Sequence, residues 1–178
     1  MKVKIGGSAL ELVKGDITEQ STEAIVNAAN KRLALGGGVA GAIHRAAGPE
    51  LWGECRKLGG CETGKAKLTK GYNLPARYVI HTVGPIYSGS PQDAELLEAC
   101  YKNSLKLAVR KGIKSVSFPA ISTGAFGYPM EKAARVALKA VIIFMKKHHE
   151  IKLVRFVLYS SRALRIHEEA LKEVFGKT

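Results

Sequence analysis

Residues 24–48 read AIVNAANKRLALGGGVAGAIHRAAG, and this stretch carries the strongest information about the fold. A short apolar segment leads through two asparagines, Asn27 and Asn30, to three consecutive glycines and then to a run of small residues with helical spacing. Glycines between a strand and a helix let the backbone approach a ligand closely, and the positive end of the helix dipole favours an anion there. The stretch therefore predicts a strand–loop–helix unit with a pocket for a phosphorylated ligand. A flexible loop explains the three glycines about as well.

Outside this stretch, short apolar segments alternate with helical segments along the chain. Strands are predicted at residues 3–5, 9–13, 24–27, 65–69, 78–83, 115–118 and 153–159. Helices are predicted at residues 39–47, 49–58, 92–111, 130–148 and 163–175. Such alternation is typical of helices packed on both faces of a sheet. We predict a single α/β domain over residues 1–178, a three-layer α/β/α sandwich with a mixed, largely parallel central sheet.

The polar and glycine-rich segments each follow a predicted strand. They are residues 15–17, residues 27–38 and residues 119–127. In open α/β sheets, ligands bind outside the carboxyl ends of the strands. We therefore expect these three loops to meet at one edge of the sheet.

The composition bounds the class of protein. The chain has 28 Lys and Arg residues against 15 Asp and Glu, a net charge of +13, which attracts anionic ligands and, non-specifically, nucleic acid. The basic residues form no tail or aromatic-interleaved stripe, so a solvated basic surface explains the charge at least as well as a nucleic-acid face. No apolar run approaches the roughly 18 residues of a membrane span, and the N-terminus lacks the pattern of a signal peptide. We therefore expect a cytoplasmic protein, in which the three cysteines without CxxC spacing are reduced thiols. The one histidine cluster, His148-His149, lies at a lysine-rich helix end, so we expect no metal, and we expect no cofactor.

Five segments in order resemble the macro domain family, most closely its MacroD-type ADP-ribosyl hydrolases. They are KGDIT (14–18), VNAAN (26–30), GGGVAGAIHRAAG (36–48), GCETGKAKLTKGYNLPARYVIHTVGP (60–85) and FPAISTGAFGYP (118–129). The resemblance extends from about residue 9 to the last predicted helix. It implies that the chain binds ADP-ribose or ADP-ribosylated proteins. It also implies hydrolysis of mono-ADP-ribosyl esters on proteins, of O-acetyl-ADP-ribose, or of both.

The resemblance implies a place for each part of the ligand. Asp16 would accept from the adenine amine with the Ile17 amide nearby, and capping of a turn at residues 18–20 is the alternative role for Asp16. The loop at residues 36–39, called the glycine loop below, and the loop at residues 122–126 would wrap the diphosphate with backbone donors. Tyr159 would stack on adenine. The implied ligand-binding residues are Asp16, Ile17, Asn27, Asn30, Gly36, Gly37, Gly38, Val39, Ser122, Thr123, Gly124, Ala125, Phe126 and Tyr159.

The same resemblance implies that Asn30, Gly37 and Phe126 act at the distal ribose, Asn30 and Gly37 by holding it and Phe126 by orienting it. The position of Asn27 at the end of its predicted strand favours a structural role. His81 lies inside a predicted strand, which favours a core histidine over a ligand-binding one. For His44, on the helix after the glycines, packing and an approach to the ribose are equally compatible with the sequence.

One position departs from the family pattern. MacroD-type hydrolases usually carry an aspartate directly after GGGV, where this chain has Ala40. A side-chain general base contributes typically about 10² to 10⁴ in rate, so this help is missing from its usual place. The diphosphate of the substrate is a plausible base instead, with Asn30 and the glycine loops fixing the geometry. Three hypotheses follow: an ADP-ribosyl hydrolase, a non-catalytic reader of ADP-ribose, and, from the charge alone, a nucleic-acid-binding protein.

Overall fold

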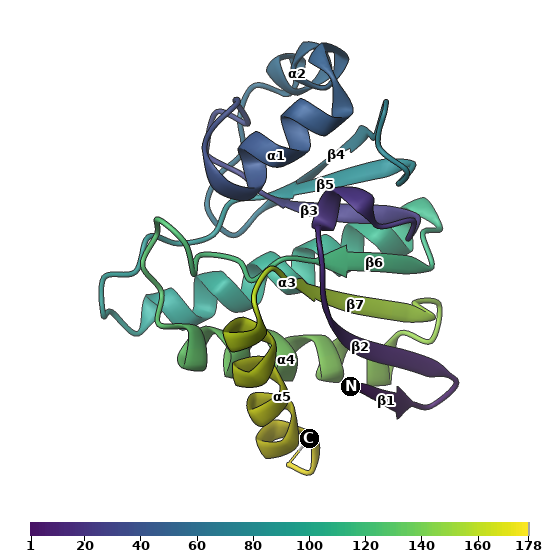
Figure 1. The fold of residues 1–178 in the computed structure, drawn as a ribbon, viewed down its shortest axis with the longest axis vertical. Coiled ribbons are helices and arrows are strands. Elements are labelled where there is room, and N and C mark those ends of the chain that lie inside the picture. Colours follow the sequence, from purple (N-terminus) through teal and green to yellow (C-terminus); the bar gives the residue numbers. More distant parts are fainter. Residues whose placement is uncertain (178) are drawn as a thin grey trace.

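The computed structural model describes residues 1–177 and consists of a mixed sheet with helices on both faces (Figure 1). The strands are β1 (Lys2–Ile5), β2 (Ser8–Lys14), β3 (Ala24–Ala28), β4 (Ala66–Lys70), β5 (Tyr78–Thr82), β6 (Ser115–Phe118) and β7 (Leu153–Leu158). The helices are α1 (Gly38–Ala47), α2 (Pro49–Cys55), α3 (Gln92–Lys111), α4 (Met130–Lys147) and α5 (Ser161–Phe175), with short 3₁₀ helices η1 (Ile17–Glu19) and η2 (Arg56–Leu58). The observed α/β/α architecture confirms the predicted fold class.

The predicted elements agree with these bounds to within about two residues, with two informative differences. The helix predicted at residues 49–58 is α-helical only to Cys55 and then tightens into η2. Helix α5 starts two residues earlier than predicted because the Ser160 hydroxyl accepts a hydrogen bond from the Ala163 N–H at 3.1 Å and caps the helix. Within residues 1–177, no helix combines the length and apolar character needed to cross a bilayer.

The strand order is β1-β2-β7-β6-β3-β5-β4. From β2 to β5 every neighbouring pair is parallel, while β1 and β4 add antiparallel edges. The carboxyl ends of β2, β7, β6, β3 and β5 therefore meet at one edge of the sheet, in that order. This edge receives all three of the polar and glycine-rich loops.

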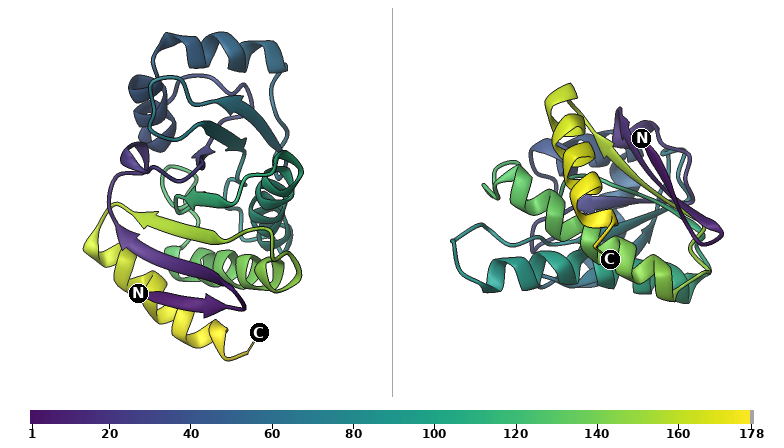
Figure 2. Two further views of the ribbon diagram at one scale, coloured as in Figure 1. Left: turned by 90° about the vertical axis from the view of Figure 1, so that its right-hand side faces the viewer. Right: turned by 90° about the horizontal axis from the view of Figure 1, so that it is seen from below.

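The two faces of the sheet bury separate apolar clusters, as period-2 alternation along the strands requires. On β3, Ala24 and Val26 belong to the cluster that contains residues of α3, α4 and α5, whereas Ile25 belongs to the one that contains residues of α1 and α2. Figure 2 shows α3 and α4 on one side of the sheet and α1 with α2 at the β4 end. This packing holds α1, and with it the glycine loop, rigidly against the end of β3.

Candidate functional site

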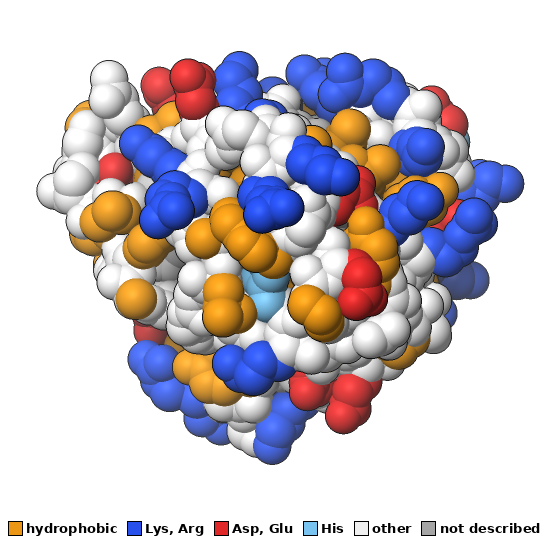
Figure 3. All heavy atoms as spheres, turned by 90° about the horizontal axis from the view of Figure 1, so that it is seen from above, with side chains coloured by type: hydrophobic (Ala, Val, Ile, Leu, Met, Phe, Trp, Pro, Cys, Tyr) orange, Lys and Arg blue, Asp and Glu red, His pale blue; other side chains and the backbone are white. Residues whose placement is uncertain are grey.

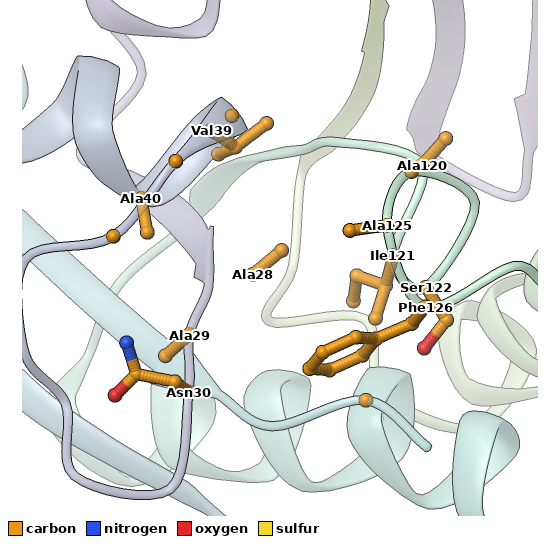
Figure 4. Close-up of a pocket in the computed structure, with 15 residues that line it drawn as sticks. Ala28, Ala29, Asn30, Val39, Ala40, Ala120, Ile121, Ser122, Ala125 and Phe126 are labelled. Atoms are coloured by element: carbon orange, nitrogen blue, oxygen red, sulfur yellow. The ribbon is translucent and has the colours of Figure 1, made fainter. Parts of the chain in front are cut away.

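A cavity of about 290 Å³ lies at the carboxyl ends of β3 and β6 (Figure 4). Four segments form it: the end of β3, the glycine loop with the start of α1, Gly84 after β5, and the loop after β6. The residues that line it are Ala28, Ala29, Asn30, Gly36, Gly37, Gly38, Val39, Ala40, Gly84, Ala120, Ile121, Ser122, Gly124, Ala125 and Phe126.

The glycine loop presents the open N-terminus of α1 to this cavity. Gly37 is the N-cap and contributes no side chain, so the N–H groups of Gly38, Val39 and Ala40 have no acceptor among residues 1–177. Gly41 lets the loop fold back on the helix, because a Cβ there would collide with the carbonyl oxygen of Gly36. The result is a set of backbone donors at the positive end of a ten-residue helix.

Asn30 holds the other end of the same loop. Its Nδ2 donates to the Ala34 carbonyl at 2.9 Å, and its Oδ1 accepts from the Ala34 N–H at 3.0 Å. The carboxamide is half-buried and lies against the glycine loop, 3.4 Å from where a Cβ on Gly36 would lie. Asn30 therefore shapes the loop as well as lining the cavity.

The loop after β6 forms the opposite wall and contains a strained residue. Ser122 has a φ of +68°, which a residue with a side chain rarely adopts, and such conformations cost of order 1 kcal/mol. Two bonds hold it there: its hydroxyl donates to the Pro85 carbonyl at 2.8 Å, and its carbonyl accepts from the Tyr128 N–H at 2.9 Å. Gly84 permits this packing, because a Cβ on Gly84 would collide with the Ser122 hydroxyl.

The same wall offers further backbone donors. Within the described chain, the N–H groups of Gly124, Ala125 and Phe126 find no protein acceptor. Figure 4 shows the Phe126 ring across the cavity from Asn30 and Ala40. Two loops with unpaired N–H groups thus flank one space, an arrangement suited to a bound anion.

No ionisable side chain lines this cavity in the described part of the chain. Ala40 is buried in the first turn of α1, on the side of the cavity that carries Asn30. An anion here would be held by backbone dipoles and the α1 dipole, since no lysine or arginine reaches it. A side-chain general base is likewise absent from the lining.

The residues expected at adenine lie beyond the cavity, at the ends of the next two strands of the sheet. Asp16 and Tyr159 follow the neighbouring strands β2 and β7, which are joined there by the Gly15 N–H bond to the Leu158 carbonyl at 2.9 Å. The Asp16 carboxylate accepts from the Thr18 N–H at 2.9 Å and the Thr18 hydroxyl at 2.7 Å, so it does cap η1. Tyr159 is 79% exposed, and Ile17 is buried under its loop.

Four other residues considered from the sequence lie away from the cavity. Asn27 is buried, with its Nδ2 3.1 Å from the His81 Nδ1, and the Thr69 hydroxyl lies 2.9 Å from the His81 Nε2. His44 is buried on α1, and Thr123 donates to the Ala120 carbonyl at 2.8 Å within its own loop. The structure therefore gives these side chains supporting positions.

The lining also includes residues that the sequence reasoning did not assign to the site. They are Ala28, Ala29, Gly84, Ala120 and Ile121. Gly84 carried a usable signal, a glycine directly after the strand predicted at residues 78–83. The small residues Ala28, Ala29 and Ala120 lie inside the loops predicted to meet at this edge, and only their individual roles in the lining were not predicted.

The surface around the α1 and α2 end is predominantly basic. Figure 3 shows Lys and Arg side chains spread over this face, interrupted by a few Asp and Glu. The positive charge of this face, together with the net charge of +13, favours the approach of an anionic ligand.

Comparison with known proteins gives a consistent set of relatives. The family model of the macro domain matches residues 26–137. A macro domain-containing protein from Chlorobaculum tepidum, CT2219, is 52% identical over 163 residues, covering 91% of this chain and 95% of that protein. The Xenopus laevis protein named ADP-ribose glycohydrolase MACROD2 is 50% identical over 182 residues, 99% of this chain. The chain spans only 44% of the length of that MACROD2 protein.

Solved structures match over the whole fold. The Oceanobacillus iheyensis macrodomain with ADP superposes with a TM-score of 0.96 at 46% identity, covering 100% of this chain and 97% of that one. The Trypanosoma brucei macrodomain in complex with ADP-ribose has a TM-score of 0.87 at 42% identity, covering 91% of this chain and 68% of that one.

Proposed function

This chain belongs to the macro domain family, and we propose that it binds ADP-ribose in the cavity between α1 and the loop after β6. We further propose that it hydrolyses mono-ADP-ribosyl esters on proteins, O-acetyl-ADP-ribose, or both. The observation that carries the proposal is the pair of facing loops with unpaired N–H groups and no cationic side chain. Such a cradle recognises a diphosphate through its oxygens.

The strand order supports a direction for the bound ligand. Asp16 and Tyr159 lie at the ends of β2 and β7, and the cavity lies at the ends of β6 and β3. Neighbouring strands are 4.7–4.9 Å apart, so β2 and β3 are separated by roughly 14 Å. Adenine would lie toward Asp16 and Tyr159, the diphosphate between the loops, and the distal ribose at Asn30 and Phe126.

For hydrolysis, the protein would act mainly by positioning. On a mono-ADP-ribosyl ester, a water would attack the anomeric carbon, the bond from this carbon to the ester oxygen would break, and the acidic side chain would leave as a carboxylate. On O-acetyl-ADP-ribose, the water would instead attack the ester carbonyl carbon, the bond from this carbon to the ribose oxygen would break, and acetate would leave while the ribose oxygen takes up a proton. Because the lining has no carboxylate of its own, the proton of the water would pass to the diphosphate of the substrate. Asn30, Gly37 and Phe126 would fix the distal ribose for this attack.

The second candidate function is a reader that binds ADP-ribose without turnover. Ala40 favours it, because an alanine in the first turn of α1 provides no general base. A reader would bind ADP-ribose in a calorimetric titration and leave an ADP-ribosylated substrate intact.

A turnover assay on a glutamate-ADP-ribosylated protein separates these functions. We expect wild type to release ADP-ribose slowly. The turnover rate of Ala40→Asp should be higher by a factor of up to about 10² to 10⁴, since it places a carboxylate facing the cavity.

Asn30→Ala should lose activity. Its ADP-ribose affinity must be measured alongside, because Asn30 also holds the Ala34 backbone. Modification that stays intact at high wild-type concentration would exclude the hydrolase.

A further inference from the structure

A second cavity, of about 510 Å³, adjoins the first on the far side of Phe126. Gly84 and Phe126 line both cavities. The rest of its wall comes from the segment after β5, from the start of α3, and from Lys31 and Thr63. The two cavities are therefore neighbours, with Gly84 and Phe126 between them.

The sheet order places this second cavity one strand beyond the proposed distal ribose. Along the shared edge the strands run β2, β7, β6, β3 and β5 (Figure 1). Asn30, after β3, lines the first cavity, and the next residue, Lys31, lines the second. A group attached to the distal ribose therefore leads toward the end of β5.

The second cavity differs chemically from the diphosphate cradle. Ile86 on its rim is 69% exposed, and the half-buried Leu96 adds apolar surface from α3. Single exposed apolar side chains are common on protein surfaces, and Ile86 matters here because it borders the same cavity as Leu96. Lys31 is an exposed cation on the same wall.

The one carboxylate of the second cavity is already engaged. Asp93 accepts from the Ser88 N–H at 2.9 Å, from the Gly89 N–H at 2.8 Å and from the Ser88 hydroxyl at 3.0 Å. The hydrogen bond from the Ser88 backbone lowers the pKa of Asp93, so this carboxylate stays charged while it closes the turn at the start of α3. Besides the exposed polar residues Ser90 and Gln92, the groups Lys31, Ile86 and Leu96 thus remain available to a partner.

We propose that the second cavity holds the polypeptide that carries the ADP-ribose, with an apolar side chain next to the modified residue lying on Ile86 and Leu96. Lys31 lies on the side of the second cavity next to Asn30, where the ester linkage to the ADP-ribose would be. This inference rests on the proposed binding of ADP-ribose in the first cavity. It assigns recognition of the acceptor protein to residues after β5 that ADP-ribose itself does not need.

Calorimetric titration with three ligands tests the assignment. The ligands are ADP-ribose, a peptide with an ADP-ribosylated glutamate beside a leucine, and the same peptide with serine in place of the leucine. Ile86→Ser should weaken binding of the leucine peptide about tenfold, which is the fold-change that loss of one apolar contact of about 1.4 kcal/mol produces. Its affinities for the serine peptide and for ADP-ribose should match wild type. Because Ile86 is exposed, this variant should fold.

The matched control is Ile143→Ser, a partly exposed isoleucine on α4 that lines neither cavity. It should bind all three ligands as wild type does. Unchanged affinity of Ile86→Ser for the leucine peptide would overturn the acceptor site, and so would an equal loss for ADP-ribose. A wild type that binds no ADP-ribose would overturn the proposed function and this inference together. Binding without turnover would remove only the hydrolase activity.

Discussion

At the residue scale, His81 shows how a polar side chain supports the site without entering it. The imidazole is fully buried between Asn27 on β3, Thr69 on β4 and the Cys55 thiol of α2, with His44 of α1 nearby. Burial, with a smaller contribution from the neighbouring His44, lowers the pKa of His81 to about 3. His81, on β5, therefore stays neutral and connects β5 to β3 and β4 through its contacts with Asn27 and Thr69.

This burial predicts loss of stability in acid. The unfolded chain takes up a proton at His81 near pH 6.5, whereas the folded chain does so only near pH 3. The free energy of unfolding should thus be highest above pH 6.5 and fall as the pH drops toward 3, by up to about 1.4 kcal/mol per pH unit from His81 alone. Burial also lowers the pKa values of His44 and His167, which adds to the slope.

Urea unfolding at pH 7, 6, 5 and 4 measures this dependence. His81→Gln should have a shallower slope than wild type, even if it is less stable at pH 7. His149→Gln, at an exposed histidine, should keep the wild-type slope. Identical slopes for wild type and His81→Gln would contradict the account of the buried imidazole.

At the element scale, α1 and the glycine loop form one unit whose shape depends on Gly41. Gly41→Ala would press a methyl group into the Gly36 carbonyl oxygen. We expect it to reduce the free energy of unfolding by about 1–3 kcal/mol and to weaken ADP-ribose binding, because the loop must move.

Gly53→Ala is the matched comparison on α2. Nothing lies within 4 Å of a Cβ at Gly53, so alanine should keep ligand affinity and stabilise the helix by up to about 1 kcal/mol. Thermal unfolding measures the stability of the two variants, and calorimetric titration measures their affinity for ADP-ribose. Wild-type affinity and stability in Gly41→Ala would show that the loop is not set by this contact.

At the scale of the whole molecule, the order of parallel strands turns separate loops into one linear site. The alternation of strands and helices predicted that these loops meet at one edge of the sheet, because each segment rich in glycine or polar residues follows a predicted strand. It did not predict that Asn30 bonds to the Ala34 backbone or that Ser122 adopts a positive φ, because both depend on how loops pack against one another. Nor did it single out the cavity beyond Phe126, whose rim depends on the exposed position of Ile86.

In the proposed site the glycine loop and the loop after β6 hold a diphosphate between them, and a substitution at Gly37 tests this arrangement. A Cβ at Gly37 would point into open space, and its φ of −87° suits any residue, so Gly37→Glu should fold as wild type does. Gly7→Glu, in the β1–β2 turn with equally open space, is the control.

The decisive measurement is calorimetric titration of ADP-ribose into these three proteins. Wild type and Gly7→Glu should each bind one ADP-ribose, and Gly37→Glu should show no detectable binding, because a side chain and a negative charge enter the diphosphate path. Wild-type affinity in a folded Gly37→Glu, or no binding by wild type, would contradict this arrangement.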